Sequence, residues 1–440
     1  MFSSPPAAHR TMLAGLAMVA LLAGAAAPAS AVAARSHAAG LRQAAHPDAG
    51  GAGWTGTWAA SPQQARPAGL TGSGDPTVTG FSDQTIREIV HVSIGGSALR
   101  LHLSDAFSQH PLQVGEVTVA AEGSGAALAG PAALATFHGR RQVTIPAGGS
   151  VASDALRLPV RPLENLAVSI YLPGVTGPTT NHDLANQVNY VSAPGNHAAE
   201  TGGQSFSGQA YSWFYLSGVD VRPQPAAVGA VVVLGDSITD GYQSTVGAND
   251  RWPDVLAARL EQSARPMGVL NEGISGNRVL GGSSCFGASA LSRLAVDVLE
   301  QAGARTVIML EGINDIGFPT QPDAGCTAPN TTVTAQQIIV GYQQIIARAH
   351  ARGLRILAGT LTPIQGSSYY TAATEQERLA VNAWIRHSHA FDGVIDFDKA
   401  VRDPADPHCL LPAYDSGDHL HPDDAGYRVM GEAVNLALLR

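Results

Sequence analysis

Hydrophobic and polar positions follow one period in the front half of the chain and another in the back half. Between residues 54 and 221 apolar residues recur at every second position, which is the spacing of strands with one buried face. Gly95 and Gly96 separate two such runs, Val90–Ile94 and Leu99–Leu103, so the pattern predicts a hairpin with one solvated face. Short runs of this kind between Gly and Pro turns predict a β-sandwich of the jelly-roll type.

The back half alternates apolar runs with segments of helical spacing. The apolar runs are 230–235, 268–270, 306–310, 354–361 and 394–396, and the helical segments are 252–260, 287–301, 334–352, 374–389 and 423–439. The unbroken run at 230–234 is typical of a strand buried on both faces. Five strands that alternate with helices predict an α/β fold, a doubly wound parallel sheet with helices on both faces.

The first residues have the pattern of a targeting segment. His9 and Arg10 precede an apolar run from Met12 to Ala27, and small residues suited to cleavage follow it. We therefore predict a signal peptide at 1–33, a disordered leader at 34–52 and a secreted, extracellular protein. Because no later segment has the length of a bilayer span, we expect no stable membrane insertion after cleavage.

Composition marks the boundary between two domains and limits the classes of molecule that the protein can bind. Two prolines in Arg222-Pro223-Gln224-Pro225 mark a linker at 223–227, between a β-sandwich domain at 53–222 and an α/β domain at 228–440. Charged residues make up 14% of the chain and the net charge is −9, which argues against nucleic acid as a partner. We expect a monomer.

Four polar blocks lie where ligands bind in such sheets, at the carboxyl ends of the strands or before the last helix. They are Gly235-Asp236-Ser237, the glycine block Asn271–Asn277, Glu311–Asp315 and Asp418–Pro422. Their order, GDS, a glycine block, GxND and DxxHP, resembles the SGNH (GDSL) hydrolase family over about residues 228–440. The resemblance implies a flavodoxin-like strand order and an ester hydrolase that needs no cofactor and no metal.

The same blocks supply candidates for nucleophilic catalysis. A serine hydroxyl needs a base within hydrogen-bond reach and an acid that holds the base in one tautomer. Ser237 is the expected nucleophile and His421 the base, and the family places its acid at Asp418. The resemblance also implies an oxyanion hole made by the backbone N–H groups of Ser237 and Gly276 and the side-chain amide of Asn314.

A metal site is the competing interpretation of the last block, since clusters of His and carboxylates bind transition metals. Its ligands would come from Asp418, His419, His421, Asp423 and Asp424. The ordered presence of Ser237, Gly276 and Asn314 favours the hydrolase, so we expect no metal. We interpret His419 as structural and Asp423 and Asp424 as negative charge on the first turn of the last helix.

Three cysteines in a secreted chain leave one unpaired. Cys285 follows the glycine block and Cys326 follows the GxND block, so both should lie in loops above the carboxyl edge of the sheet. We predict a disulfide between these two. Cys409, in the loop before the last block, is the alternative partner for either.

The expected substrate follows from the type of family member that the chain resembles. A β domain joined to a GDS domain resembles secreted two-domain GDSL esterases, some of which remove acyl groups from plant polysaccharides. We expect the substrates to be short-chain acyl esters, acetyl esters in particular, on an extracellular polysaccharide. The β domain would bind the polymer and raise its effective concentration at the active site. The alternatives are a GDSL-type lipase or phospholipase and, from another class, a carbohydrate-binding protein with an inactive hydrolase domain. The aromatic cluster 211–215 fits either a sugar platform or, more often, a core.

Overall fold

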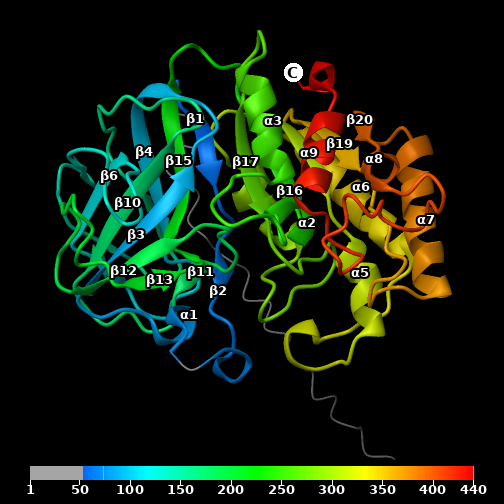
Figure 1. Ribbon diagram of the computed structural model, residues 1–440, viewed down its shortest axis with the longest axis horizontal. Helices are drawn as coiled ribbons and strands as arrows, with labels where there is room; N and C mark the ends of the chain where they lie inside the picture. Colours follow the sequence, from blue (N-terminus) through cyan, green and yellow to red (C-terminus); the bar gives the residue numbers. More distant parts are fainter. Residues whose placement is uncertain (1–52, 73, 440) are drawn as a thin grey trace, which may run out of the picture. The chain divides into compact units, whose positions relative to one another are not determined.

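The computed structural model describes residues 53–72 and 74–439 (Figure 1). The predicted signal peptide and leader lie outside the described residues, and the domain division at 223–227 stays a prediction. No helix in the described part of the chain is long and apolar enough to cross a membrane.

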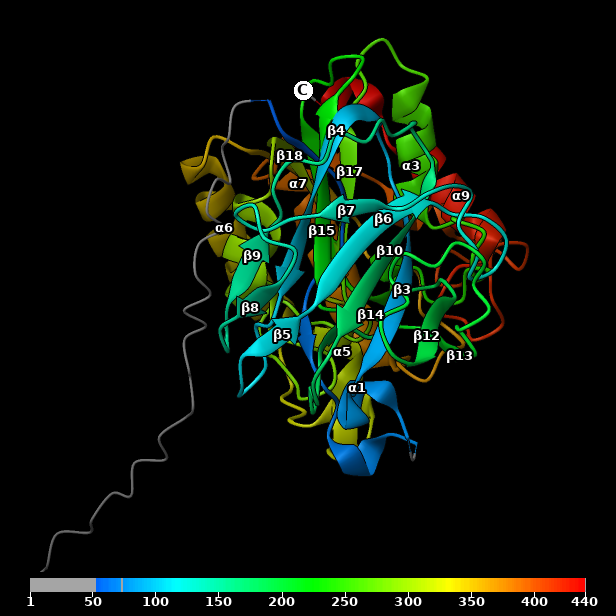
Figure 2. The same ribbon diagram turned by 90° about the vertical axis from the view of Figure 1, so that its left-hand side faces the viewer.

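Antiparallel strands build the front half, which we call the β region (residues 53–223). Its elements are β1 (Thr55–Ala59), β2 (Gln63–Gln64), η1 (Ala68–Leu70), α1 (Pro76–Thr79), β3 (Gln84–His91), β4 (Gly96–Ser104), β5 (Leu112–Val114), β6 (Glu116–Ala121), β7 (Ala133–Ala135), β8 (Val143–Ile145), β9 (Ser150–Ala152), β10 (Asn165–Leu172), β11 (Thr180–His182), β12 (Asn189–Pro194), β13 (Gly208–Ala210), β14 (Trp213–Phe214) and β15 (Leu216–Pro223). The main sheets have the orders β1-β15-β4-β9 and β13-β12-β3-β10-β6-β7, and Figure 2 shows β6, β10 and β3 side by side. Apolar side chains from both sheets share one core, as the alternation predicted.

The predicted hairpin across Gly95 and Gly96 is wrong. β3 pairs with β10 and β12, whereas β4 pairs with β15 and β9, so the chain passes from one sheet to the other at the glycines. The backbone is crowded there, because a Cβ on Gly95 would lie 2.5 Å from the Val160 carbonyl oxygen. Only glycine fits so close an approach.

The expected solvated face of β4 is buried as well. Arg100 Nε and His102 Nε2 both lie 2.7 Å from Asp220 Oδ2 on the neighbouring strand β15. A buried carboxylate therefore holds the two polar side chains that an alternating pattern assigns to solvent. In the aromatic cluster, Trp213, Phe214 and Tyr215 are buried and belong to the core, while Tyr211 is exposed.

The back half has the predicted parallel sheet. Its elements are β16 (Ala230–Gly235), α2 (Ser237–Asp240), α3 (Trp252–Glu261), β17 (Gly268–Gly273), α4 (Ala290–Leu294), the π-helical η2 (Ala295–Leu299), β18 (Ala304–Leu310), α5 (Ile313–Gly317), η3 (Phe318–Thr320), η4 (Gly325–Thr327), α6 (Ala335–Ala351), β19 (Arg355–Gly359), α7 (Ala372–His387), β20 (Gly393–Ile395), α8 (Phe397–Val401), α9 (Asp424–Ala433) and η5 (Leu436–Leu438). The order β17-β16-β18-β19-β20, all parallel, confirms the flavodoxin-like arrangement.

Helices cover this sheet, and two of them begin where the sequence supplies caps. α3 packs against α9, and α6 packs against α7 and β19 (Figure 1). Thr334 and Thr371 form capping boxes at the starts of α6 and α7. The last helix, α9, is shorter than the predicted 423–439 segment, because the backbone turns extended at Val434. Arg259 donates to the carbonyls of Gly431 and Val434 at this end of the helix.

Candidate active site

Ser237 lies at the first position of α2, directly after the central strand β16. Asp236 caps the helix by accepting a 3.0 Å hydrogen bond from Ile238 N–H, and Gly241 ends it with φ +98°, a left-handed conformation that favours glycine. This short, capped helix fixes the serine at the carboxyl edge of the sheet. Its Oγ lies 2.8 Å from His421 Nε2.

Asp418 holds the imidazole of His421 in one orientation. Asp418 Oδ2 lies 2.7 Å from His421 Nδ1, and Oδ1 accepts hydrogen bonds from the Leu420 and His421 N–H groups. Burial favours a higher pKa for Asp418, but the hydrogen bond and charge of His421 and these backbone donors outweigh it and hold the pKa well below its usual range. An ionised Asp418 requires a proton on Nδ1, which leaves the lone pair of Nε2 facing Ser237.

The other polar residues of the last block point elsewhere. His419 Nδ1 pairs with Asp415 Oδ2 at 2.5 Å, and its ring is exposed. Asp423 caps α9, while Asp424 accepts hydrogen bonds from Thr245 N–H and Oγ1. Among residues 53–72 and 74–439, no group of three His, Cys, Asp or Glu side chains has an arrangement that could hold a metal ion.

The three groups expected in the oxyanion hole come from three strand ends. Gly276 has φ +78°, and a Cβ there would lie 2.4 Å from the Phe286 ring, so the position requires glycine. Asn314 donates from Nδ2 to the Asn277 carbonyl at 2.9 Å, and its Oδ1 accepts a 2.8 Å hydrogen bond from Tyr369 OH. These two contacts fix the amide and leave one Nδ2 hydrogen for another acceptor.

Buried side chains inside and outside the motifs brace these loops. Arg293, on α4, donates to the carbonyls of Gly235 and Glu272 and to Asn277 Oδ1. Asp315 accepts from the N–H groups of Val279 and Leu280. Arg293 and Tyr369 are functional candidates that the sequence motifs do not mark. The one available signal was an arginine within the apolar helical segment 287–301.

Burial also shifts the pKa values of two acidic residues that the motifs contain. Desolvation raises the pKa of Asp236 to about 7 and that of Asp315 to about 6, although both accept backbone hydrogen bonds. Both carboxyl groups lie next to expected site residues, Ser237 and Asn314. Each accepts backbone N–H groups of the loop beside it, so both carboxyl groups brace these loops.

The disulfide joins the two cysteines that the sequence analysis paired. Cys285 and Cys326 are bonded, with Cα atoms 5.2 Å apart, and they lie 41 positions apart in the chain. Cys409 is a free cysteine whose Sγ accepts a 3.4 Å hydrogen bond from Gln365 Nε2. The bond ties the loop after the glycine block to the loop after the GxND block.

Residues 233–429 match the GDSL-like Lipase/Acylhydrolase family. Among solved structures, the chain is similar to a member of the lipolytic protein G-D-S-L family from Veillonella parvula, with 21% identity, a TM-score of 0.34 and coverage of 46% of this chain and 94% of that one. It is also similar to a GDSL-like lipase from Bacteroides thetaiotaomicron, with 18% identity, a TM-score of 0.33 and coverage of 48% and 87%. An acetyl xylan esterase shares 17% identity at a TM-score of 0.34, with coverage of 46% and 96%. No curated protein matches the chain.

Proposed function

Residues 233–429 form a domain of the GDSL-like Lipase/Acylhydrolase family, whose members are ester hydrolases, and on this premise we propose that the protein is a secreted serine esterase. Its proposed substrates are short acyl esters, acetyl above all, on an extracellular polysaccharide. The observation that supports the chemistry is a continuous chain of hydrogen bonds. Ser237 Oγ lies 2.8 Å from His421 Nε2, and His421 Nδ1 lies 2.7 Å from Asp418 Oδ2.

In the proposed reaction, Ser237 Oγ attacks the ester carbonyl while His421 Nε2 takes its proton. The carbonyl oxygen becomes an oxyanion that the N–H groups of Ser237 and Gly276 and the Asn314 amide stabilise. His421 then returns the proton to the leaving alcohol, which yields an acyl-enzyme. A water molecule, activated by the same imidazole, releases the acid and restores Ser237.

The surroundings of the serine favour a short acyl group and a large alcohol. The segment between α2 and α3 has no helix and leaves Tyr242 41% exposed, with its ring 4.7 Å from that of His421 between centroids. An exposed aromatic ring beside the base offers a flat apolar surface of the kind that sugar rings stack on. Because no helix is inserted between α2 and α3, this segment supplies no apolar helix to cover a fatty acyl chain.

A panel of 4-nitrophenyl esters from acetyl to octanoyl tests the acyl group. Because each methylene changes binding in a fitted pocket by about 1–3 kcal/mol, kcat/KM should decline steadily from acetyl onward. Release of acetate from acetylated xylan tests the carrier, with Ser237→Ala as the control for both. Faster turnover of octanoyl than of acetyl esters would instead favour the lipase, and binding of xylan without hydrolysis of any ester would favour the inactive binding protein.

A further inference from the structure

We propose that the β region positions one side of the oxyanion hole through His182, which holds the loop of Gly276 by way of Asp240 and Ser275. The inference rests on the proposed function and assigns a positioning residue to the half of the chain outside the 233–429 family match. His182 does not touch the reacting atoms, so its effect on catalysis would pass through the backbone of the glycine block.

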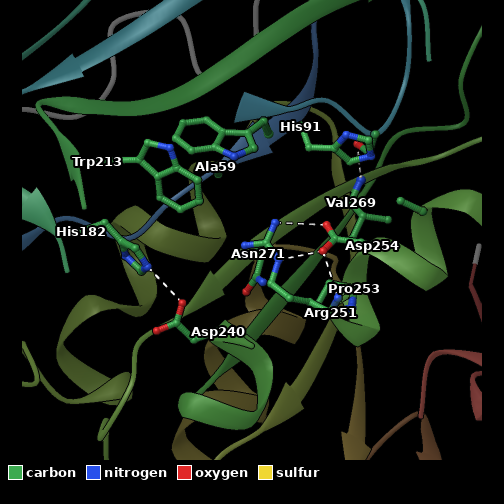
Figure 3. A pocket seen from close by; sticks show the side chains of 13 residues that line it. Ala59, His91, His182, Trp213, Asp240, Arg251, Pro253, Asp254, Val269 and Asn271 are labelled. Carbon is green, nitrogen blue, oxygen red and sulfur yellow. Dashed lines mark hydrogen bonds and ion pairs between the residues drawn. The ribbon is translucent and has the colours of Figure 1, made fainter. Parts of the chain in front are cut away.

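The Asp240 carboxylate links the β region, the helix α2 and the loop of Gly276. His182 Nε2, at the end of β11, lies 3.1 Å from Asp240 Oδ1 (Figure 3). Asp240 Oδ2 accepts hydrogen bonds from Ser275 N–H at 2.8 Å and from Ser275 Oγ at 2.7 Å. Asp240 is the last residue of α2, which begins with Ser237, and Ser275 directly precedes Gly276. The carboxylate therefore links the helix of the nucleophile to the loop of the oxyanion donor.

The partners of His182 determine its protonation. Its Nδ1 lies 3.0 Å from the Ser61 carbonyl oxygen, and its Nε2 faces the Asp240 carboxylate. Both partners are acceptors, so both ring nitrogens must donate, and the ring is a buried imidazolium. Burial lowers the pKa of His182, but the charge and hydrogen bond of Asp240 and the hydrogen bond to Ser61 raise it by more.

The other charged side chains near the His182 ring are consistent with a protonated imidazole. The charge of Asp183 raises the pKa of His182, as the charge of Asp240 does. Arg251 shares the cavity beside the ring and is paired with Asp254 at 2.7 Å (Figure 3). The cavity measures about 20 Å³, which is room for about one water molecule, so it is packing space and not a ligand site.

Further contacts show that the β region supports this edge of the sheet. Asn186 Nδ2 donates to the Gly241 carbonyl at 2.7 Å, and Ser61 Oγ donates to Glu272 Oε2 at 2.6 Å. At the opposite end of β17, Ser93 Oγ accepts a 2.9 Å hydrogen bond from Val269 N–H. Ser93 thus offers a matched control, a buried contact between the same two halves whose hydrogen bonds go to Thr57 and Val269 and not to Asp240 or Ser275.

The experiment compares His182→Leu, His182→Gln, Ser275→Ala and Ser93→Ala with the wild type in 4-nitrophenyl acetate hydrolysis. Oxyanion donors act in the transition state, and removal of one lowers kcat about 10²–10³-fold. A displaced Gly276 N–H should therefore lower kcat by part of this factor. We expect His182→Leu to lower kcat about 10–100-fold with KM within about twofold. His182→Gln, which keeps a donor toward Asp240, should recover most of the loss, and Ser93→Ala should stay within about twofold of wild type.

Hydrogen exchange of the amides at 274–278 gives a readout that does not depend on activity. Exchange should accelerate in His182→Leu and Ser275→Ala but not in Ser93→Ala. Wild-type kcat in a folded His182→Leu, or equal losses in His182→Leu and Ser93→Ala, would overturn the inference. If His182→Leu does not fold, unchanged exchange and kcat in Ser275→Ala would overturn it. A wild type that hydrolyses no ester while the exchange pattern holds would refute the proposed function and leave the positioning role standing.

Discussion

Removal of one hydroxyl group, in Tyr369→Phe, tests whether the amide of Asn314 must be held in place for catalysis. Tyr369 OH donates the 2.8 Å hydrogen bond to Asn314 Oδ1, and both side chains are buried. The Tyr369 ring packs closely on Gly317, where a Cβ would lie 2.0 Å from it, and edge-on against Phe318. Phenylalanine keeps this packing, so the variant removes the hydrogen bond alone.

The structure bounds the size of the effect. A buried acceptor without its donor costs about 1–3 kcal/mol, and the Asn314 amide can relieve this cost by turning away from the oxyanion. The upper limit is the loss of the whole donor, about 10²–10³-fold in kcat. Because about 1.4 kcal/mol corresponds to a factor of ten, we expect Tyr369→Phe to lower kcat about tenfold and Asn314→Ala about 10²–10³-fold.

Steady-state hydrolysis of 4-nitrophenyl acetate by the two single variants and the double variant completes the test. If Tyr369 acts through Asn314, the double variant should be no slower than Asn314→Ala. Tyr370→Phe is the matched control, since its ring is 38% exposed. Wild-type kcat in Tyr369→Phe, or additive losses in the double variant, would refute this role of the hydroxyl group.

Three further predictions concern the acid, a buried carboxyl group and the disulfide. Asp418→Asn should lower kcat about 10⁴-fold and His421→Ala about 10⁶-fold, because the acid orients the base without taking the proton; equal losses in ester hydrolysis would contradict this. Asp236 has a pKa of about 7 in the folded state, above its unfolded value, so folding stability falls as pH rises from about 4 to 7. Asp236→Asn keeps the helix cap and should be more stable than wild type at pH 8 by up to about 4 kcal/mol but not at pH 4, as urea titrations would show. Replacing Cys285 and Cys326 together by serine should lower the free energy of unfolding by about 4 kcal/mol for a span of 41 positions; an unchanged urea midpoint would speak against a disulfide in the native protein.

The parallel sheet and the positions of the expected site residues followed from local signals. Unbroken apolar runs marked β16 and β18, and polar blocks at their ends placed Ser237 and Asn314 at one edge of the sheet. Helix starts were readable where caps exist, as at Thr334. These features depend on neighbours in the chain, which is why the sequence suffices for them.

Features that depend on distant partners were not predictable. The alternation in β4 is real, but Asp220, 120 positions from Arg100, decides that its polar face is buried. The pairing of β3 likewise depends on β10, whose hydrogen bonds take the place of a hairpin. His182 meets Asp240 from the other half of the chain, and no local pattern indicates such a contact.

The β region packs directly against the active-site half, and its expected role in raising the local concentration of a polymer stays a prediction. Ser61 and His182 reach the loops of the glycine block and α2, and Gly56 packs directly against Leu270 of β17, where a Cβ would lie 2.7 Å from the leucine side chain. A tether would raise the local concentration of a polymer and leave small esters unaffected. These contacts lead instead to the expectation that defects in the β region slow hydrolysis of small esters as well.

The identity of the nucleophile is tested most directly by covalent labelling with an alkyl fluorophosphonate and peptide mapping by mass spectrometry. We expect one adduct, on Ser237, in the wild type, and neither an adduct nor hydrolysis of 4-nitrophenyl acetate in a folded Ser237→Ala. An adduct on another residue, or ester hydrolysis that persists in Ser237→Ala, would contradict this assignment.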